Sequence, residues 1–199
     1  MKLNLKTTLL TGSAIVALGA FGATQAQASS VAGTDTNSPT VTTTYTSAQT
    51  GGAPSGAAVD NDAAGLRLGG DAIQFAGAAP STTAVTITVN GVAITGGAGL
   101  AAASDADSGG ADAGGAGGNG VNIPSSEDGS STIYSTITGN STASFVGGVG
   151  AAGGAGNASV GGAGGAGGDA VYVDANYARV TGAADFTGAV GGAGGAANG

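Results

Sequence analysis

Short stretches in which apolar and polar residues alternate recur along this chain. Three blocks share one shape: a Gly, then Asp or Asn, then a small residue, then apolar, polar and apolar residues in turn. The blocks are residues 70–75, 118–123 and 168–173, and their starts lie 48 and 50 residues apart. Alternation with a period of two is typical of a strand with one buried face. Each block is therefore predicted to be a β-strand, with a turn at the Asp or Asn, whose side chain bonds nearby backbone amides.

A second β-prone segment follows each block. These segments are residues 84–89, 131–137 and 177–181, and a Thr-Gly phrase accompanies each, at 94–96, 137–139 and 186–188. A run of Gly and Ala then leads to the next block. Such a period allows two turns of roughly two dozen residues each, or one turn with a long Gly-rich excursion.

Repetition of short strands at a fixed spacing is typical of a solenoid. One turn of this repeat has too few apolar side chains for a core of its own. Turns stacked at about 4.8 Å would line up Ile, Val and Phe in internal columns. We expect an all-β fold over residues 66–199, a right-handed parallel β-helix with Gly-rich loops. A β-sandwich and a partly disordered chain are the alternatives.

The first 65 residues differ from this repeat. Residues 1–28 have the order of a secretory signal peptide: two lysines, an apolar stretch too short to span a bilayer, and an Ala-Gln-Ala cleavage site that ends at Ala28. Residues 29–65 are rich in Ser and Thr, and are interpreted as a flexible spacer or as a first strand that caps the repeat. We therefore expect an exported chain, with no membrane insertion by this segment.

The composition excludes several classes of function. The chain has no Cys and no His, so it has no Ser-His-Asp or Cys-His catalytic site and no thiolate or imidazole metal centre. Removal of residues 1–28 leaves Arg67 and Arg179 against twelve acidic residues, a net charge of −10. So few basic residues argue against nucleic acid or anionic lipid as a partner.

The leader, the recurring Ile-Thr-Gly phrase, and the Gly-Gly-Ala-Gly-Gly runs that enter a Gly-Asp/Asn-x-Val strand resemble the passenger region of bacterial autotransporters. The resemblance covers about residues 66–199. It implies a right-handed parallel β-helix at the cell surface or outer membrane, or in the extracellular space. Autotransporters carry a C-terminal β-barrel translocator, whereas this chain ends at Gly199 within a Gly-rich run. We therefore expect a truncated passenger, an N-terminal fragment, and the alternative is a secreted relative without its own barrel.

One segment carries the pattern of a calcium-binding repeat. Residues 164–172 fit the nonapeptide G-G-x-G-x-D-x-U-x at every fixed position, and residues 114–122 fit it with Asn119 in place of Asp. In proteins with this repeat, carboxylate and carbonyl oxygens hold Ca²⁺ between consecutive turns. The two copies here stand 50 residues apart, so Asp169 is interpreted as a turn residue and not as a calcium ligand.

Two acidic clusters receive structural interpretations. Asp105, Asp107 and Asp112 lie in a stretch without the Gly-x5-Glu continuation of an EF-hand, which indicates a solvated loop. Glu127 and Asp128 are interpreted as a turn.

The remaining candidates are surface features. Glycosylation patterns at Asn140 and Asn157 are interpreted as coincidence, given the bacterial type of leader. Tyr134, Tyr172 and Tyr177 are candidates for an exposed aromatic contact. Tyr172 is the best of them, because it alternates with two valines and is expected to face outward.

The expected function is that of a secreted or cell-surface structural or adhesin-like module, and not of an enzyme. A rigid stack of strands would present Gly-rich loops to a ligand on a host or neighbouring cell. No catalytic, cofactor-binding or metal-binding residue is assigned, no cofactor is expected, and the oligomeric state is left open. The alternatives are a Ca²⁺-binding secreted β-roll and, less favoured, a polysaccharide-degrading β-helix enzyme with charged side chains on one strand face.

Overall fold

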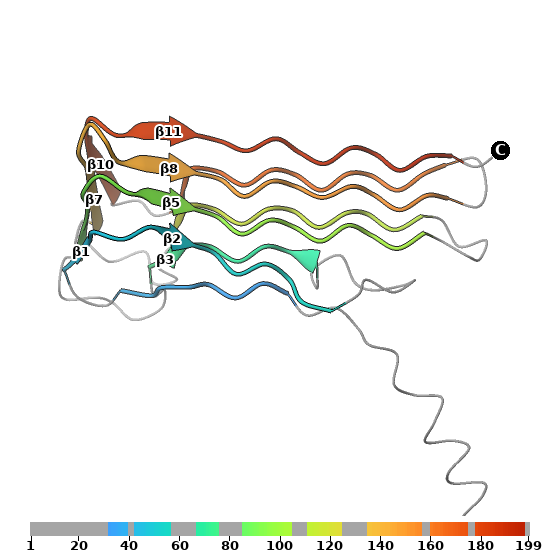
Figure 1. The fold of residues 1–199 in the computed structure, drawn as a ribbon, viewed down its shortest axis with the longest axis horizontal. Helices are drawn as coiled ribbons and strands as arrows, with labels where there is room; N and C mark the ends of the chain where they lie inside the picture. The colour runs from blue at the N-terminus through green and yellow to red at the C-terminus, as the bar shows by residue number, and fades with distance from the viewer. Residues whose placement is uncertain are drawn as a thin grey trace, which may run out of the picture.

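The computed structural model describes residues 32–39, 42–56, 67–75, 85–104, 111–124, 135–156, 160–174 and 178–197. These residues form eleven short strands that pair in parallel into three sheets (Figure 1). Successive strands along the chain belong to the three sheets in a fixed order, and from β3 onward this order occurs three times. The prediction of an all-β fold with parallel sheets is therefore confirmed for the described part of the chain.

The sheets are defined by their hydrogen-bonded strand order. Sheet I has the order β1-β4-β7-β10, which are Thr43–Tyr45, Thr86–Val89, Ser135–Gly139 and Ala178–Gly182. Sheet II has the order β11-β8-β5-β2, which are Asp185–Thr187, Ser144–Val146, Ala93–Thr95 and Gln49–Thr50. Sheet III has the order β3-β6-β9, which are Ile73–Gln74, Val121–Ile123 and Val171–Val173.

Sheet III is built from the three recurring blocks, in the predicted register. Ile73 pairs with Val121, and Val121 pairs with Val171. The blocks are therefore neighbours in space, although about 50 residues separate them in the chain. One turn per repeat, with a long Gly-rich excursion, is the arrangement observed.

The core consists of apolar columns that cross the turns. The aligned and fully buried pairs are Ile87 with Ile137 in sheet I, Ile94 with Phe145 in sheet II, and Ile73 with Val121 in sheet III. They belong to one apolar cluster with members from all three sheets. Each such side chain contributes about 1.5–3 kcal/mol on burial, so the columns stabilise the turns by stacking. At one end of the cluster, burial raises the pKa of the Tyr45 phenol above its ordinary value of 10.0.

Beyond the strands, the Gly-rich segments form a bundle of extended chains. Segments 96–103, 147–156 and 188–197 leave sheet II and are called the outgoing segments. Segments 67–72, 111–120 and 160–170 lead into sheet III and are called the returning segments. Figure 1 shows these chains side by side, projecting to one side of the strands along the long axis of the molecule. The six segments together are the glycine bundle.

Hydrogen bonds in the glycine bundle repeat every three residues. Gly147 donates its N–H at 3.0 Å to the carbonyl of Thr187, the last residue of β11 before the next outgoing segment. Gly148 donates instead to the carbonyl of Gly118 in a returning segment at 2.8 Å, and Val149 is exposed. The pattern continues through Gly150 and later triplets. Three residues per turn, with bonds between chains and not within them, is the geometry of the polyproline II helix.

Glycine is required where these helices approach each other. A methyl group on Gly147 would collide with the carbonyl oxygen of Gly168, and one on Gly148 would collide with that of Gly97. The third position of each triplet faces solvent and accepts Ala or Val. The Gly-Gly-Ala pattern therefore encodes two contact positions and one outward position.

One expected correspondence is wrong. Ile94-Thr95 and Phe186-Thr187 lie in β5 and β11 of sheet II, but Ile137-Thr138 lies in β7 of sheet I. The equivalent position in that turn belongs to Phe145-Val146 of β8, which aligns with both of the other pairs. The Thr-Gly phrase recurs because Thr suits either sheet, and it does not mark one place in the turn.

The first turn begins upstream of residue 66. β1 pairs with β4 and β2 pairs with β5, so parts of the Ser/Thr-rich segment 29–65 belong to the same sheets as the later turns. Residues 1–28, interpreted as a signal peptide, lie outside the described residues. Across the described ranges, no helix is long and apolar enough to cross a membrane.

The bundle geometry predicts opposite effects for one substitution in successive turns. Val146 pairs with Thr187, so Gly147 and Gly188 are equivalent positions. We expect Gly147→Ala to lower the free energy of unfolding by about 3 kcal/mol, because a main-chain carbonyl blocks the methyl group. Gly188→Ala is the matched control, since nothing lies within 4 Å of the added methyl group, and its effect should stay within about 0.5 kcal/mol. Urea denaturation in dilute solution, followed by circular dichroism, measures both. Equal losses would contradict the requirement for close approach.

Candidate functional site

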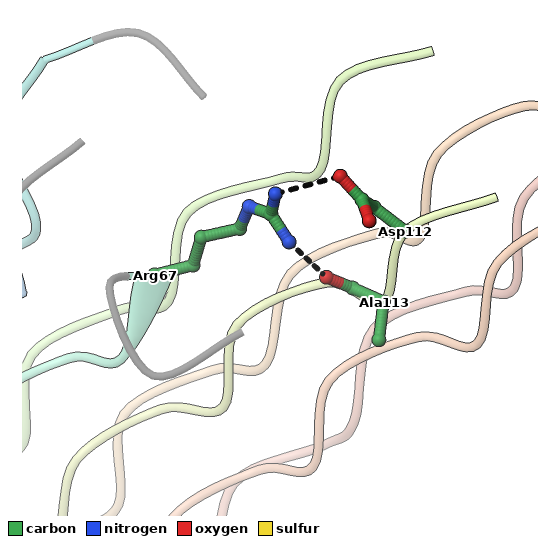
Figure 2. A network of polar contacts seen from close by, with 3 residues as sticks. All are labelled: Arg67, Asp112 and Ala113. Carbon is green, nitrogen blue, oxygen red and sulfur yellow. Dashed lines mark hydrogen bonds and ion pairs between the residues drawn. The ribbon is translucent and has the colours of Figure 1, made fainter. Parts of the chain in front are cut away.

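The returning side of the glycine bundle holds a buried cation. Arg67 is the first residue of returning segment 67–72 and is 1% exposed. Its Nη2 donates to Oδ2 of Asp112 at 2.8 Å, and its Nη1 donates to the carbonyl of Ala113 at 3.0 Å (Figure 2). The main-chain carbonyl of Arg67 accepts the N–H of Leu100 at 2.9 Å. One arginine thus connects two returning segments and an outgoing one.

This ion pair has a structural consequence. Removing a charge from water costs several kcal/mol, and the carboxylate and carbonyl around Arg67 offset that cost. The two donors of the guanidinium fit only one alignment of segment 111–120. The pair therefore fixes the register between segments whose glycines have no side chains to specify it. Sequence reasoning missed Arg67. Its available signal was the placement of one of only four basic residues beside a Gly-rich run.

The acidic cluster of residues 105–112 is corrected at one position. Asp112 was expected in a solvated loop, but it is half-buried and paired with Arg67. Asp105 and Asp107 lie outside the described residues, as do Glu127 and Asp128. Among the described residues, the cluster therefore contributes one carboxylate with a structural role, that of Asp112.

A ladder of Asp and Asn side chains runs across the turns at the entrance to sheet III. Oδ1 of Asp35 accepts the N–H of Asp71 at 2.8 Å, and Oδ1 of Asp71 accepts the N–H of Asn119 at 2.6 Å. Oδ1 of Asn119 accepts the N–H of Asp169 at 2.9 Å. Asp71 also accepts a bond from Nδ2 of Asn122 at 2.7 Å. These side chains were expected to cap amides nearby in the sequence. They cap the amide of the next turn instead, because stacking brings equivalent residues together.

The ladder includes the main chain at the Asp of the nonapeptide pattern. Asp169 is exposed, and its N–H belongs to the ladder through Asn119. Among the described residues, no three Asp, Glu, His or Cys side chains gather where they could hold a metal ion. The main chain at Asp169 therefore has a specific partner, Asn119 of the neighbouring turn, which sequence spacing did not identify.

The outgoing face of the glycine bundle is apolar and uncharged. Segments 96–103, 147–156 and 188–197 contain Gly, Ala, Val and Leu and no charged or other polar residue. The hydrogen bond from Gly150 to the carbonyl of Val190, at 3.1 Å, places Val190 next to the row that contains Val149. Both valines are exposed. The surface formed by these three segments is called the outgoing face. A regular surface of small side chains is suited to contact with another surface.

The other surface candidates divide between described and undescribed residues. Tyr172 on β9 is 43% exposed, but the neighbouring Val173 is 42% exposed as well, so the alternation does not account for its exposure at this edge of sheet III. Tyr134 and Tyr177 lie outside the described residues, as does Asn157. Oδ1 of Asn140 accepts the N–H groups of Gly91 and Thr142, at 3.0 Å and 3.3 Å, so this side chain bridges two corners of the stack.

Charged side chains are sparse on the strands. Arg179 on β10 and Asp185 on β11 are the charged residues within the described strands. A pair of carboxylates across one sugar-binding site would be needed for glycoside hydrolysis. The described strands supply one carboxylate, that of Asp185.

Comparisons with known protein families, with curated proteins and with solved structures give no match to this chain.

The Arg67–Asp112 pair predicts a strongly coupled double substitution. Asp112→Ala should lower the free energy of unfolding by about 3 kcal/mol, because it leaves a buried guanidinium without its carboxylate. Arg67→Met combined with Asp112→Ala should recover most of that loss, since the charge is then removed as well. Asp174→Ala, at an exposed acid, is the matched control and should be nearly neutral. Urea titrations of the single and double variants measure the coupling. Additive losses would show that the pair does not act as a unit.

Proposed function

We propose that the chain is an exported structural or adhesin-like module, part of an autotransporter passenger displayed at the cell surface. The observation that carries this proposal is the outgoing face, an uncharged surface on a bundle that projects beyond the strands. A surface of this kind is suited to broad contact with a host or neighbouring cell.

The three sheets are proposed to be the faces of a right-handed parallel β-helix. Parallel pairing, one shared apolar cluster and the repeated order of sheets III, I and II support it. Connections between parallel strands are right-handed in nearly all proteins, which favours this hand. Asp71, Arg67 and the bundle hydrogen bonds stiffen the module, so that contact by its outgoing face loses little conformational entropy.

Export is tested by expression of the full chain in a Gram-negative host. Cleavage after Ala28 should release a chain that begins at Ser29, and mass spectrometry of the periplasmic and extracellular fractions measures it. Ala26→Arg should block cleavage, because the site requires a small residue, whereas Gln27→Arg is a matched control at the tolerant central position. Full-length chain retained in the cytosol would contradict export.

Adhesion is tested with beads that carry residues 29–199, a segment that includes every described residue. Beads should be retained on epithelial or bacterial cell layers more than albumin-coated beads, by about tenfold for each 1.4 kcal/mol of contact energy. Val149→Asp with Val190→Asp should reduce retention to the albumin level, because it places two charges on the outgoing face. Ala163→Asp with Ala166→Asp, at exposed small residues of a returning segment, should retain binding. Retention no better than albumin for the unaltered chain would refute the adhesive role.

A further inference from the structure

Threonine recurs at the outward positions of sheet I. The inward positions hold the buried column of Ile87 and Ile137, so the alternate positions face away from the core. One outward column runs in register across all four strands and consists of Thr44, Thr88, Thr138 and Thr181. The other lies two residues earlier and consists of Thr42, just before β1, with Thr86, Thr136 and Arg179. These two columns are called the threonine face.

The repetition of one residue is specific to this sheet. In sheet II, one outward column changes from turn to turn, with Ala93, Ser144 and Asp185. The outward column of sheet III is equally varied, with Gln74, Asn122 and Tyr172. Strand formation accepts many residue types at such positions, as those two sheets illustrate. A preference for strands therefore does not account for threonine at every position of the threonine face except Arg179.

The two columns form a rectangular array of hydroxyl and methyl groups. Paired strands lie about 4.7–4.9 Å apart, and residues two apart in a parallel strand lie about 6.6 Å apart. In ice, tetrahedral O–H···O bonds of about 2.75 Å place alternate oxygens about 4.5 Å apart and repeat their layers about every 7.3 Å. The array therefore matches the lattice of ice to within about a tenth in both directions.

The hydroxyl groups are held in place and keep bonding capacity for water. Oγ1 of Thr138 and Oγ1 of Thr181 lie 2.9 Å apart in a hydrogen bond, and Thr181 also donates to the carbonyl of Ile137 at 3.3 Å. A hydroxyl has one donor and two acceptor sites, so acceptor sites remain for water. Behind the face, Ile87 and Ile137 are fully buried in the core. Because the array is fixed in advance, contact with a lattice costs little conformational entropy.

The threonine face is uncharged, although the chain as a whole is acidic. From β1 to β7 every outward residue is Thr, in a chain with twelve acidic and four basic residues. Arg179 adds one charge at β10. An ice surface carries no net charge, and its water molecules both donate and accept hydrogen bonds, as a hydroxyl does. Nucleic acid or anionic lipid would instead require a set of basic side chains.

We propose that the threonine face binds the surface of ice. The hydroxyl groups bond water molecules of the crystal, and the methyl groups order further water, because apolar surface restricts the orientation of its first hydration shell. A chain bound at many lattice points hinders growth of the crystal around it, so the freezing point falls below the melting point. This surface is distinct from the outgoing face, and the inference does not rest on adhesion to cells.

Thermal hysteresis, the gap between the melting and freezing points of a seed crystal, tests the proposal. Residues 29–199 should give a gap that grows with protein concentration, whereas albumin at equal molarity should give none. Thr88→Tyr should abolish the gap, because Tyr is accepted in strands but its protruding ring holds the neighbouring threonines away from the crystal. Thr95→Tyr, at a half-buried outward threonine of sheet II, is the matched control and should keep the full gap. Circular dichroism reports whether each variant is folded, and Thr44→Tyr, at an exposed position of the same face, provides a second variant.

Uptake into a slowly growing body of ice provides the second measurement. The unaltered chain and Thr95→Tyr should enter the ice, whereas Thr88→Tyr, Thr44→Tyr and albumin should stay in the liquid, as measured on gels. A freezing point equal to that of albumin, or equal losses at Thr88 and Thr95, would overturn the inference. Retention on crystalline cellulose without any effect on ice would assign the face to carbohydrate and overturn it as well. Adhesion was tested at Val149 and Val190 on another face, so either proposal can fail without the other.

Discussion

The structure depends on main chains that approach one another without side chains between them. Each helix of the glycine bundle bonds to its neighbours through N–H and carbonyl groups at 2.7–3.1 Å, and a Cβ at most of its glycines would collide with a main-chain oxygen. Glycine usually weakens regular structure because its unfolded state is so free. Here that cost is offset by the main-chain bonds that the close approach allows. The hydrogen-bonded β-strands form the base from which these chains project.

The strands could be predicted from the sequence because their information is local. The alternation at 70–75, 118–123 and 168–173 specifies a buried face, and the spacing specifies which strands become neighbours. The mis-assigned Thr-Gly phrase at Ile137 shows the limit of this approach. A β-branched residue beside Gly fits any sheet of the turn, so its recurrence does not reveal which sheet it enters.

The glycine bundle and the polar contacts were harder to predict because their partners are distant. The Gly-rich runs were interpreted as loops. Their triplets with two glycines were not recognised as a pattern of close packing between neighbouring segments. Asp71 and Asn119 were interpreted as turn residues with partners nearby in the sequence, but the amides that they accept belong to other turns. Arg67 and Asp112 are 45 residues apart, and neither carries a local motif. Such contacts become visible only when the turns are stacked.

The threefold repeat also constrains how the projection can change in length. An added Gly-Gly-Ala triplet extends a polyproline II helix by about 9 Å and returns every later residue to the same orientation. One or two added residues would rotate the outward side chain into the bundle. Because outgoing and returning helices are bonded along their whole length, a triplet gained in one must be matched in the other. The length of the projecting bundle can therefore change only in steps of one triplet. It can differ among turns without any change in the strands at its base.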